Sequence, residues 1–327
     1  MAESKWKNFV RSKKGALLLG LLTMLCWGSL FPMVKLGYRA FDVDTSSPGS
    51  ILLFAGLRFF ICGLLLVLFV WRRDRRLSLS DRQTLLPVFM IALTAYILHY
   101  TCTYLGLANL ESSKTAIIKQ IGTLFIVCFA FLFRREDRFT LAKLAGGILG
   151  FASILEIHLE GLRLRFTVWD LLVVCASFAS VASTIFSKNA YDRCDPLYVT
   201  ALSQLIGGAI LLLIGMLLGG RMGKAGPVPF WILAYICLAS CVGYGLWNLL
   251  LKYHDMSRMS TIKFAETLFS AVFSWTILGE NIFRWQYLFS FALVAAGLII
   301  STHSKPYTTS RPRHGSKFLW RGCFLCG

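Results

Sequence analysis

Apolar stretches of about twenty residues recur along this chain from residue 16 to residue 302. A helix needs about 20 apolar residues to cross the hydrocarbon core of a bilayer, where its backbone polar groups must bond within the segment. Only 15% of the residues are charged and 56% are hydrophobic, whereas soluble domains carry about 25% charged residues. The pattern predicts an all-α membrane protein with ten transmembrane helices, at 16–38, 51–71, 85–108, 113–133, 139–157, 168–188, 197–219, 230–253, 259–279 and 285–303.

The basic residues predict how the chain is oriented. Most of the 34 Lys and Arg residues fall on the side that takes the N-terminal segment 1–15 and the basic tail 304–327. Lys and Arg accumulate on the cytoplasmic side of membrane proteins, so we expect a multi-pass protein of the cell membrane with both termini in the cytoplasm. Because topology accounts for the net charge of +18, we expect the lipid bilayer as a partner and no nucleic acid.

The chain repeats itself at a spacing of 144 residues. Residues 113–139, aligned without gaps to 257–283, share nine identities, among them Lys119 with Lys263 and Glu136 with Glu280. We therefore expect two five-helix repeats, at 16–157 and 168–303. Because five is odd, the second repeat would run through the membrane inverted, an arrangement typical of transporters.

Several motifs carry a resemblance to a known family. They are "WGSLFPMVK" in the first span, "GLRFF" in the second, "YLGLANLESSKTA" before the fourth, and "ILGENIFRWQYLFSFALVAAGLII" with its Gly279-Glu280 pair. Over residues 15–303 the chain resembles the drug/metabolite transporter superfamily, in its bacterial form with two EamA repeats. The resemblance implies a ten-helix bundle that exports or exchanges small organic solutes.

The chain also departs from that family. Its fourth and ninth spans read "QIGTLF" and "FAETLF", without the proline that many members carry, and Lys119 and Lys263 are not standard there. The Lys119 stretch is similar to the fourth helix of the sugar-phosphate translocators, which handle anions.

The two lysines lie several residues inside apolar segments. Lys119 is about six residues from one end of its span, or roughly 9 Å at 1.5 Å per residue, and Lys263 lies equally deep from the opposite face. Each could extend its ammonium back to the interface, but ionisable residues inside a membrane usually mark a functional site. Glu266, at i+3, is the expected partner of Lys263. Lys119 would then be an unpaired cation for a substrate carboxylate or phosphate.

Further candidates for substrate binding lie on the first, third and eighth spans. Spacings of i, i+3 and i+4 place polar and aromatic side chains on one helix face, although aromatic residues often serve packing alone. A histidine side chain ordinarily titrates near physiological pH, which makes His99 a candidate for proton coupling. Lys35 and Arg58, near the outer ends of their helices, are expected to extend to the membrane interface. The expected substrate-binding residues are Lys119, Lys263, Glu266, His99, Tyr100, Tyr244, Asn248 and Trp27.

Taken together, the sequence predicts a secondary transporter of a small organic metabolite that is anionic or zwitterionic: an amino acid, a carboxylate or a phosphorylated compound. We expect no cofactor, no metal site and no enzymatic activity, since motifs such as HExxH and paired aspartates are missing from the sequence. A membrane-embedded enzyme and a non-transporting scaffold remain the alternatives. The protein is expected to be a monomer or a homodimer.

Overall fold

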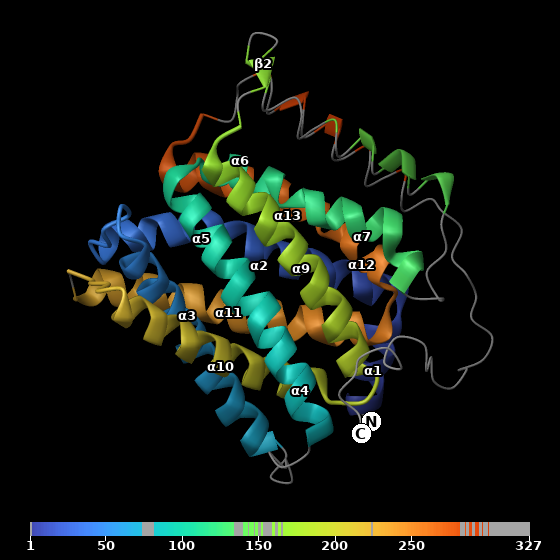
Figure 1. Cartoon of the computed structure of the whole chain (residues 1–327). Helices are drawn as coiled ribbons and strands as arrows, with labels where there is room; N and C mark the ends of the chain where they lie inside the picture. The colour runs from blue at the N-terminus through green and yellow to red at the C-terminus, as the bar shows by residue number, and fades with distance from the viewer. Residues whose placement is uncertain are drawn as a thin grey trace, which may run out of the picture.

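The computed structural model describes residues 2–73, 82–133, 166–223 and 225–281, together with scattered residues between 140 and 164 and between 285 and 300. Within these residues it is a helical bundle with one two-residue hairpin (Figure 1). The first half contains α1 (Ala2–Arg11), α2 (Lys13–Ala40), α3 (Pro48–Arg73), α4 (Arg82–Ile91), the π-helix η1 (Ala92–Leu98), α5 (His99–Asn109), α6 (Ser112–Ile118) and α7 (Gln120–Phe133). The second half contains α9 (Val168–Tyr191), α10 (Pro196–Leu217), α11 (Pro227–Tyr253), α12 (Met256–Ile262), α13 (Phe264–Phe273) and the π-helix η2 (Ser274–Leu278).

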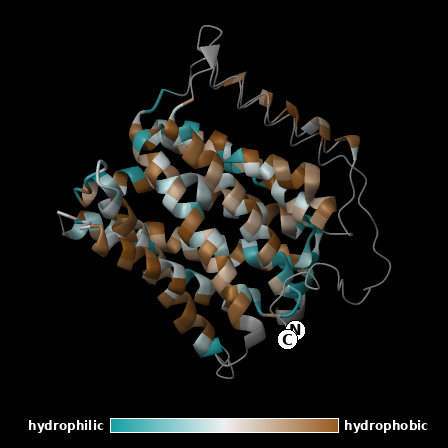
Figure 2. Ribbon diagram, in the orientation of Figure 1, coloured by the Kyte–Doolittle hydropathy of each residue, from teal (hydrophilic) through white to brown (hydrophobic). Residues whose placement is uncertain are grey.

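The helices account for eight of the expected spans. Among the described residues, seven helical segments are long and apolar enough to cross a membrane, and an eighth, Phe264–Leu278, is shorter and follows α12. They match the first to fourth and sixth to ninth expected spans. The fifth and tenth, 139–157 and 285–303, lie largely outside the described residues, so the number ten remains a prediction. Hydrophobic residues run along most of the helices (Figure 2).

Outside the helices, the described residues include one short β-hairpin. Between the two halves, strand β1 (Leu159–Glu160) pairs antiparallel with β2 (Arg163–Leu164). Two strands of two residues each close only a tight turn, and they lie in the connection between apolar segments. The hairpin therefore does not alter the helical architecture of the membrane-embedded part.

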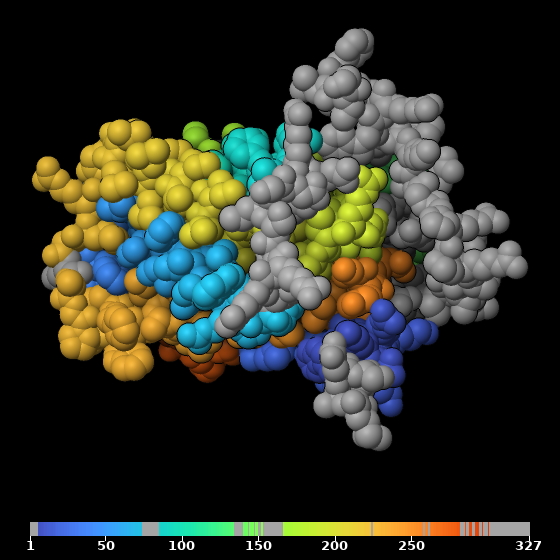
Figure 3. Space-filling model, turned by 90° about the horizontal axis from the view of Figure 1, so that it is seen from below, coloured from blue at the N-terminus to red at the C-terminus, as the bar shows by residue number. Residues whose placement is uncertain are grey.

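The helices of the two halves pack against each other in matching pairs. The first helix of one half contacts the third helical segment of the other, as α2 with α11 and α9 with α5. The second helices, α3 and α10, pack directly together, and Figure 3 shows α3 between α10 and α11. The fourth segments also meet, through α7 with α12 and α6 with α13. This pattern is what a two-fold relation between repeats produces.

The α3–α10 contact depends on glycine. A Cβ on Gly56 or Gly63 of α3 would lie 2.3 Å from a backbone nitrogen of α10. A Cβ on Gly208 or Gly215 of α10 would lie 2.3 and 2.5 Å from a backbone nitrogen of α3. Small residues allow membrane helices to approach this closely. In both helices the two glycines are seven residues apart, and this seam joins the halves beside the interior cavity.

Candidate functional site

A cavity of about 90 Å³, measured as the space open to the centres of water molecules, lies between the two halves. One buried water needs roughly 10–15 Å³ by this measure, so the cavity holds several waters or a small solute. Its wall includes all eight residues that the sequence predicts for substrate binding: Trp27, His99, Tyr100, Lys119, Tyr244, Asn248, Lys263 and Glu266. Both halves contribute, which is the position expected of a transporter's binding site.

Each half interrupts its fourth helical segment at the equivalent lysine. Lys119 separates α6 from α7 and has φ −58° and ψ −22°, while Lys263 separates α12 from α13 and has φ −60° and ψ −22°. Neither break contains a proline. Side chains from neighbouring helices bond to the carbonyls there: Gln120 Nε2 lies 3.4 Å from Lys263 O, and Ser177 Oγ lies 3.5 Å from Ile118 O. A side chain bonded into the helical ladder is one recognised cause of a local distortion.

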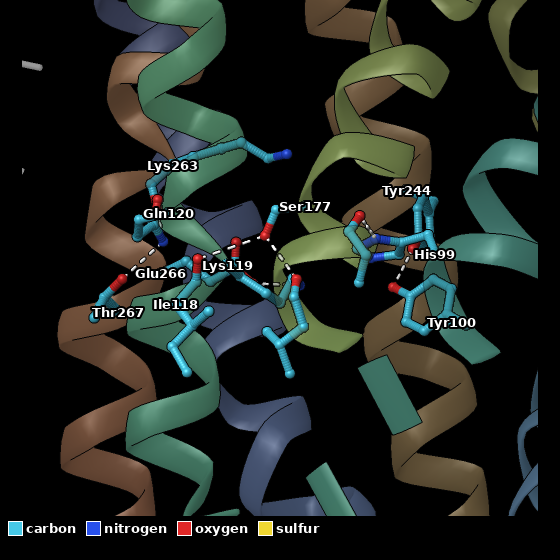
Figure 4. Close-up of polar contacts among 12 residues, drawn as sticks. His99, Tyr100, Ile118, Lys119, Gln120, Ser177, Tyr244, Lys263, Glu266 and Thr267 are labelled. Atoms are coloured by element: carbon cyan, nitrogen blue, oxygen red, sulfur yellow. Dashed lines mark hydrogen bonds and ion pairs between the residues drawn. The ribbon is translucent and has the colours of Figure 1, made fainter. Parts of the chain in front are cut away.

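Glu266 pairs with the lysine of the other half. Lys119 Nζ lies 3.5 Å from Glu266 Oε1, and the two side chains are 16% and 7% exposed. The expectation that Glu266 pairs with Lys263 and leaves Lys119 unpaired was therefore wrong. Because α6 and α7 pack against α13 and α12, the facing helix brings Lys119 to the carboxylate. Figure 4 shows the stem of Lys263 extending away from this pair.

Lys263 lies against aromatic rings instead. Its ammonium is 5.6 Å from the ring centre of Trp27 and 5.1 Å from that of Trp247. Among the described residues, the structure gives Lys263 Nζ no hydrogen bond and no ion pair. Cation–π contacts stabilise an ammonium by about 0.5–2 kcal/mol but carry no opposite charge. Lys263 is therefore the lysine whose charge is available to a solute.

The two predicted tyrosines occupy equivalent positions in the two repeats and contact each other. Tyr100 and Tyr244, 144 residues apart, share a hydrogen bond between their hydroxyl groups (Figure 4). Trp27 packs against Tyr244 with ring centres 5.2 Å apart. Asn248 is buried and donates from Nδ2 to Thr200 Oγ1 at 2.6 Å. Tyr244 and Asn248 thus belong to the cavity wall, as does Tyr100 opposite them.

His99 follows the π-helical turn η1 in the third span. Its Nδ1 lies 2.7 Å from the carbonyl oxygen of Ala176, and its ring packs edge-on against Tyr100, 4.6 Å between centres. A carbonyl only accepts, so Nδ1 carries the proton and Nε2 of the neutral ring is an acceptor. π-helical turns often occur at functional sites. Whether His99 takes part in proton coupling stays a prediction.

Arg58 is the site residue that sequence reasoning missed. It was expected to extend to the membrane interface, but it is 1% exposed and lines the cavity. Nε and Nη2 donate to Ser240 Oγ at 3.0 and 2.8 Å, and Nη1 donates to the hydroxyl of Tyr104. Depth along a sequence does not reveal which way a side chain points, so Arg58 could not be placed from its position alone.

Lys35 forms an ion pair with the other half of the chain. Its ammonium lies 3.5 Å from Glu280 Oε1, and its extension to the membrane interface stays a prediction. Glu280 accepts hydrogen bonds from the backbone N–H of Ser112 and of Ser113 and from the Ser113 hydroxyl. These donors lie at the N-terminus of α6, where the helix dipole stabilises a negatively charged carboxylate. The Gly-Glu motif of the second half therefore caps a helix of the first.

Comparison with known proteins gives the context of this site. The chain is 28% identical over 294 residues, 89% of this chain and 92% of the relative, to the uncharacterized transporter YvbV of Bacillus subtilis. It is 25% identical to the S-adenosylmethionine/S-adenosylhomocysteine transporter of Chlamydia muridarum, over 89% of this chain and 92% of that one. It is 24% identical to a probable amino-acid metabolite efflux pump of Salmonella typhimurium, over 86% and 93%.

The fold and the family agree with these relatives. A solved crystal structure with 16% sequence identity superposes with a TM-score of 0.68 over 89% of this chain and 97% of the other, which shows a shared fold. The EamA-like transporter family matches twice, at residues 14–158 and 167–302. With its apolar helices, the chain is a multi-pass membrane protein. It belongs to the EamA-like transporter family.

Proposed function

We propose that this protein is a secondary transporter that carries a small anionic or zwitterionic metabolite across the cell membrane by alternating access. The observation that carries the proposal is the charge arrangement of the cavity. Lys119 is paired with Glu266 while Lys263 has only aromatic neighbours. A solute carboxylate would supply the anion that Lys263 lacks, and an ammonium group would be attracted by Glu266.

An α-amino acid head group fits this arrangement best within the proposed class. It presents a carboxylate and an ammonium a few ångströms apart, matching two lysines and one glutamate. Two relatives support this reading, since one is named as an S-adenosylmethionine/S-adenosylhomocysteine transporter and the other as a probable amino-acid metabolite efflux pump. Gln120 Oε1 and Thr103 Oγ1, on the cavity wall, have no hydrogen-bond partner among the described residues and add capacity to bind polar groups.

The test is binding to the purified protein by isothermal calorimetry. The panel contains amino acids, carboxylates, sugar phosphates and organic cations. We expect saturable binding of carboxylate-bearing solutes, and we expect Lys263→Gln to weaken it by about 10- to 100-fold, because one charged hydrogen-bonding partner contributes about 1.5–3 kcal/mol. Lys35→Gln is the control: it also removes one lysine charge from a predicted span, but Lys35 is ion-paired with Glu280 and does not line the cavity.

Three outcomes would contradict the proposal. A preference for organic cations that Lys263→Gln leaves unchanged would show that the lysines do not select the solute. Chemical conversion of a bound compound, detected by mass spectrometry, would favour the membrane-embedded enzyme. Failure of every panel compound to bind, while the folded protein keeps its thermal transition, would favour a scaffold.

A further inference from the structure

Arg58 provides a second cationic group on the cavity wall, apart from the lysines. It lies on α3, and its guanidinium carbon is 4.6, 5.6 and 5.9 Å from the ring centres of Phe59, Tyr100 and Tyr104. The hydrogen bonds to Ser240 and Tyr104 hold the plane of the group. All of these partners are neutral. They orient the guanidinium without cancelling its charge.

The hydrogen-bonding capacity of Arg58 is also unfilled. A guanidinium has five N–H donors, and the bonds to Ser240 and Tyr104 use three of them, one each from Nε, Nη1 and Nη2. Among the described residues, no carboxylate lies within 4 Å of Arg58. One N–H on each of Nη1 and Nη2 remains. Two parallel N–H groups match the two oxygens of a carboxylate, which is the bidentate geometry in which arginine binds strongest.

Two charged regions therefore face the same cavity. One consists of Lys119, Lys263 and Glu266, and the other is Arg58. Tyr100 lies next to Arg58, 5.6 Å from the guanidinium, and the His99 ring packs on the same tyrosine at 4.6 Å. Among the named groups, the three cations Lys119, Lys263 and Arg58 and the one carboxylate Glu266 leave two positive charges uncompensated. A buried charge without a partner costs several kcal/mol, so a solute with two anionic groups is favoured.

We propose that Arg58 binds a second carboxylate of the transported solute, so that the preferred substrate is an acidic amino acid or a dicarboxylate. This rests on the proposed function, in which the lysine–glutamate region binds the first charged group. The spacing between the two regions is fixed by α3 and by the helix breaks. Affinity should therefore peak at one length of the chain that joins the two carboxylates.

The test compares solutes that differ in one charge. L-Glutamate and L-glutamine have the same length and the same head group, and malonate, succinate, glutarate and adipate vary the spacing. We expect wild-type protein to bind L-glutamate at least about 10-fold more tightly than L-glutamine, and one dicarboxylate to bind best. Arg58→Lys keeps the positive charge but loses the paired N–H donors of the guanidinium. It should therefore reduce the ratio of the affinities for L-glutamate and L-glutamine toward one. Arg73→Gln is the control, since Arg73 forms an exposed ion pair with Asp195 and should leave the ratio unchanged.

The outcomes separate this inference from the proposed function. Equal binding of L-glutamate and L-glutamine by wild-type protein, with both weakened by Lys263→Gln, would overturn the role of Arg58 and leave the proposed function standing. If Arg58 only joins α3, α5 and α11 structurally, Arg58→Lys will lower the thermal stability and weaken all solutes equally, with the ratio unchanged. Because the ratio of the two affinities is measured on folded variants, a loss of stability alone does not produce the predicted change in that ratio.

Discussion

Lys119 and Lys263 occupy equivalent positions in the two halves but have different surroundings. Lys119 has a carboxylate at 3.5 Å, and Lys263 has two tryptophan rings. The i, i+3 spacing that suggested a Lys263–Glu266 pair holds for a regular helix, whereas Lys263 stands at a break between α12 and α13. The repeat pattern predicted where the lysines lie, but it could not predict which of them reaches Glu266 from across the interface.

A double-mutant cycle tests this pairing. We expect the substitutions Lys119→Gln and Glu266→Gln to be coupled by about 1–2 kcal/mol in the free energy of unfolding, as for residues in direct contact. The cycle of Lys263→Gln with Glu266→Gln should give a smaller coupling, because no ion pair joins those side chains in the structure. Thermal unfolding in one detergent measures both cycles. A larger coupling for Lys263 than for Lys119 would show that the i, i+3 pair exists after all.

The helices α3 and α10 carry the closest contact between the two halves. Their glycines bring the backbones so near that an added Cβ has no room. Arg58 lies on the same helix α3, between Gly56 and Gly63. The close α3–α10 contact therefore also sets the position of the guanidinium along the cavity wall. Sequence reasoning found both helices from their apolar length, but it could not pair them, because long-range packing leaves no local pattern.

Gly63→Ala tests the seam. The new Cβ would lie 2.3 Å from Leu205 N, so the helices must separate, and we expect a loss of about 1–3 kcal/mol in unfolding free energy. Gly245→Ala is the matched control within α11, where the Cβ would meet only Leu197 Cδ1 at 3.6 Å. Since Ala favours a helix over Gly by about 1 kcal/mol, the control should be neutral or stabilising. Equal effects of the two variants would contradict the close packing.

At the scale of the whole molecule, the sequence predicted most of the helices and the family. Twenty-residue apolar runs are a local signal, so eight expected spans match described helices within a few residues. The contents of the cavity were harder to predict, because they depend on distant partners: Arg58 bonds to Tyr104, 46 residues away, and to Ser240, 182 residues away. Such contacts follow from how the two halves pack.

The orientation in the membrane remains a prediction with a direct test. From the distribution of Lys and Arg we expect both termini in the cytoplasm, with Ser46 outside and Cys194 on the inner side. Single-cysteine variants, Ser46→Cys and one that keeps only Cys194, are treated with an impermeant thiol reagent on intact cells. Labelling at position 46 alone is the expected result. Labelling at Cys194 and not at position 46 would invert the assignment.

Counterflow in proteoliposomes tests whether the cavity between the halves moves a solute across the membrane. Vesicles containing the purified protein are loaded with unlabelled acidic amino acid or dicarboxylate, and entry of the labelled compound is followed. We predict transient accumulation of label that disappears in protein-free vesicles and falls sharply with Lys263→Gln but not with Lys35→Gln. Binding of the same solute without any flux, or flux that Lys263→Gln leaves unchanged, would contradict the proposed transport.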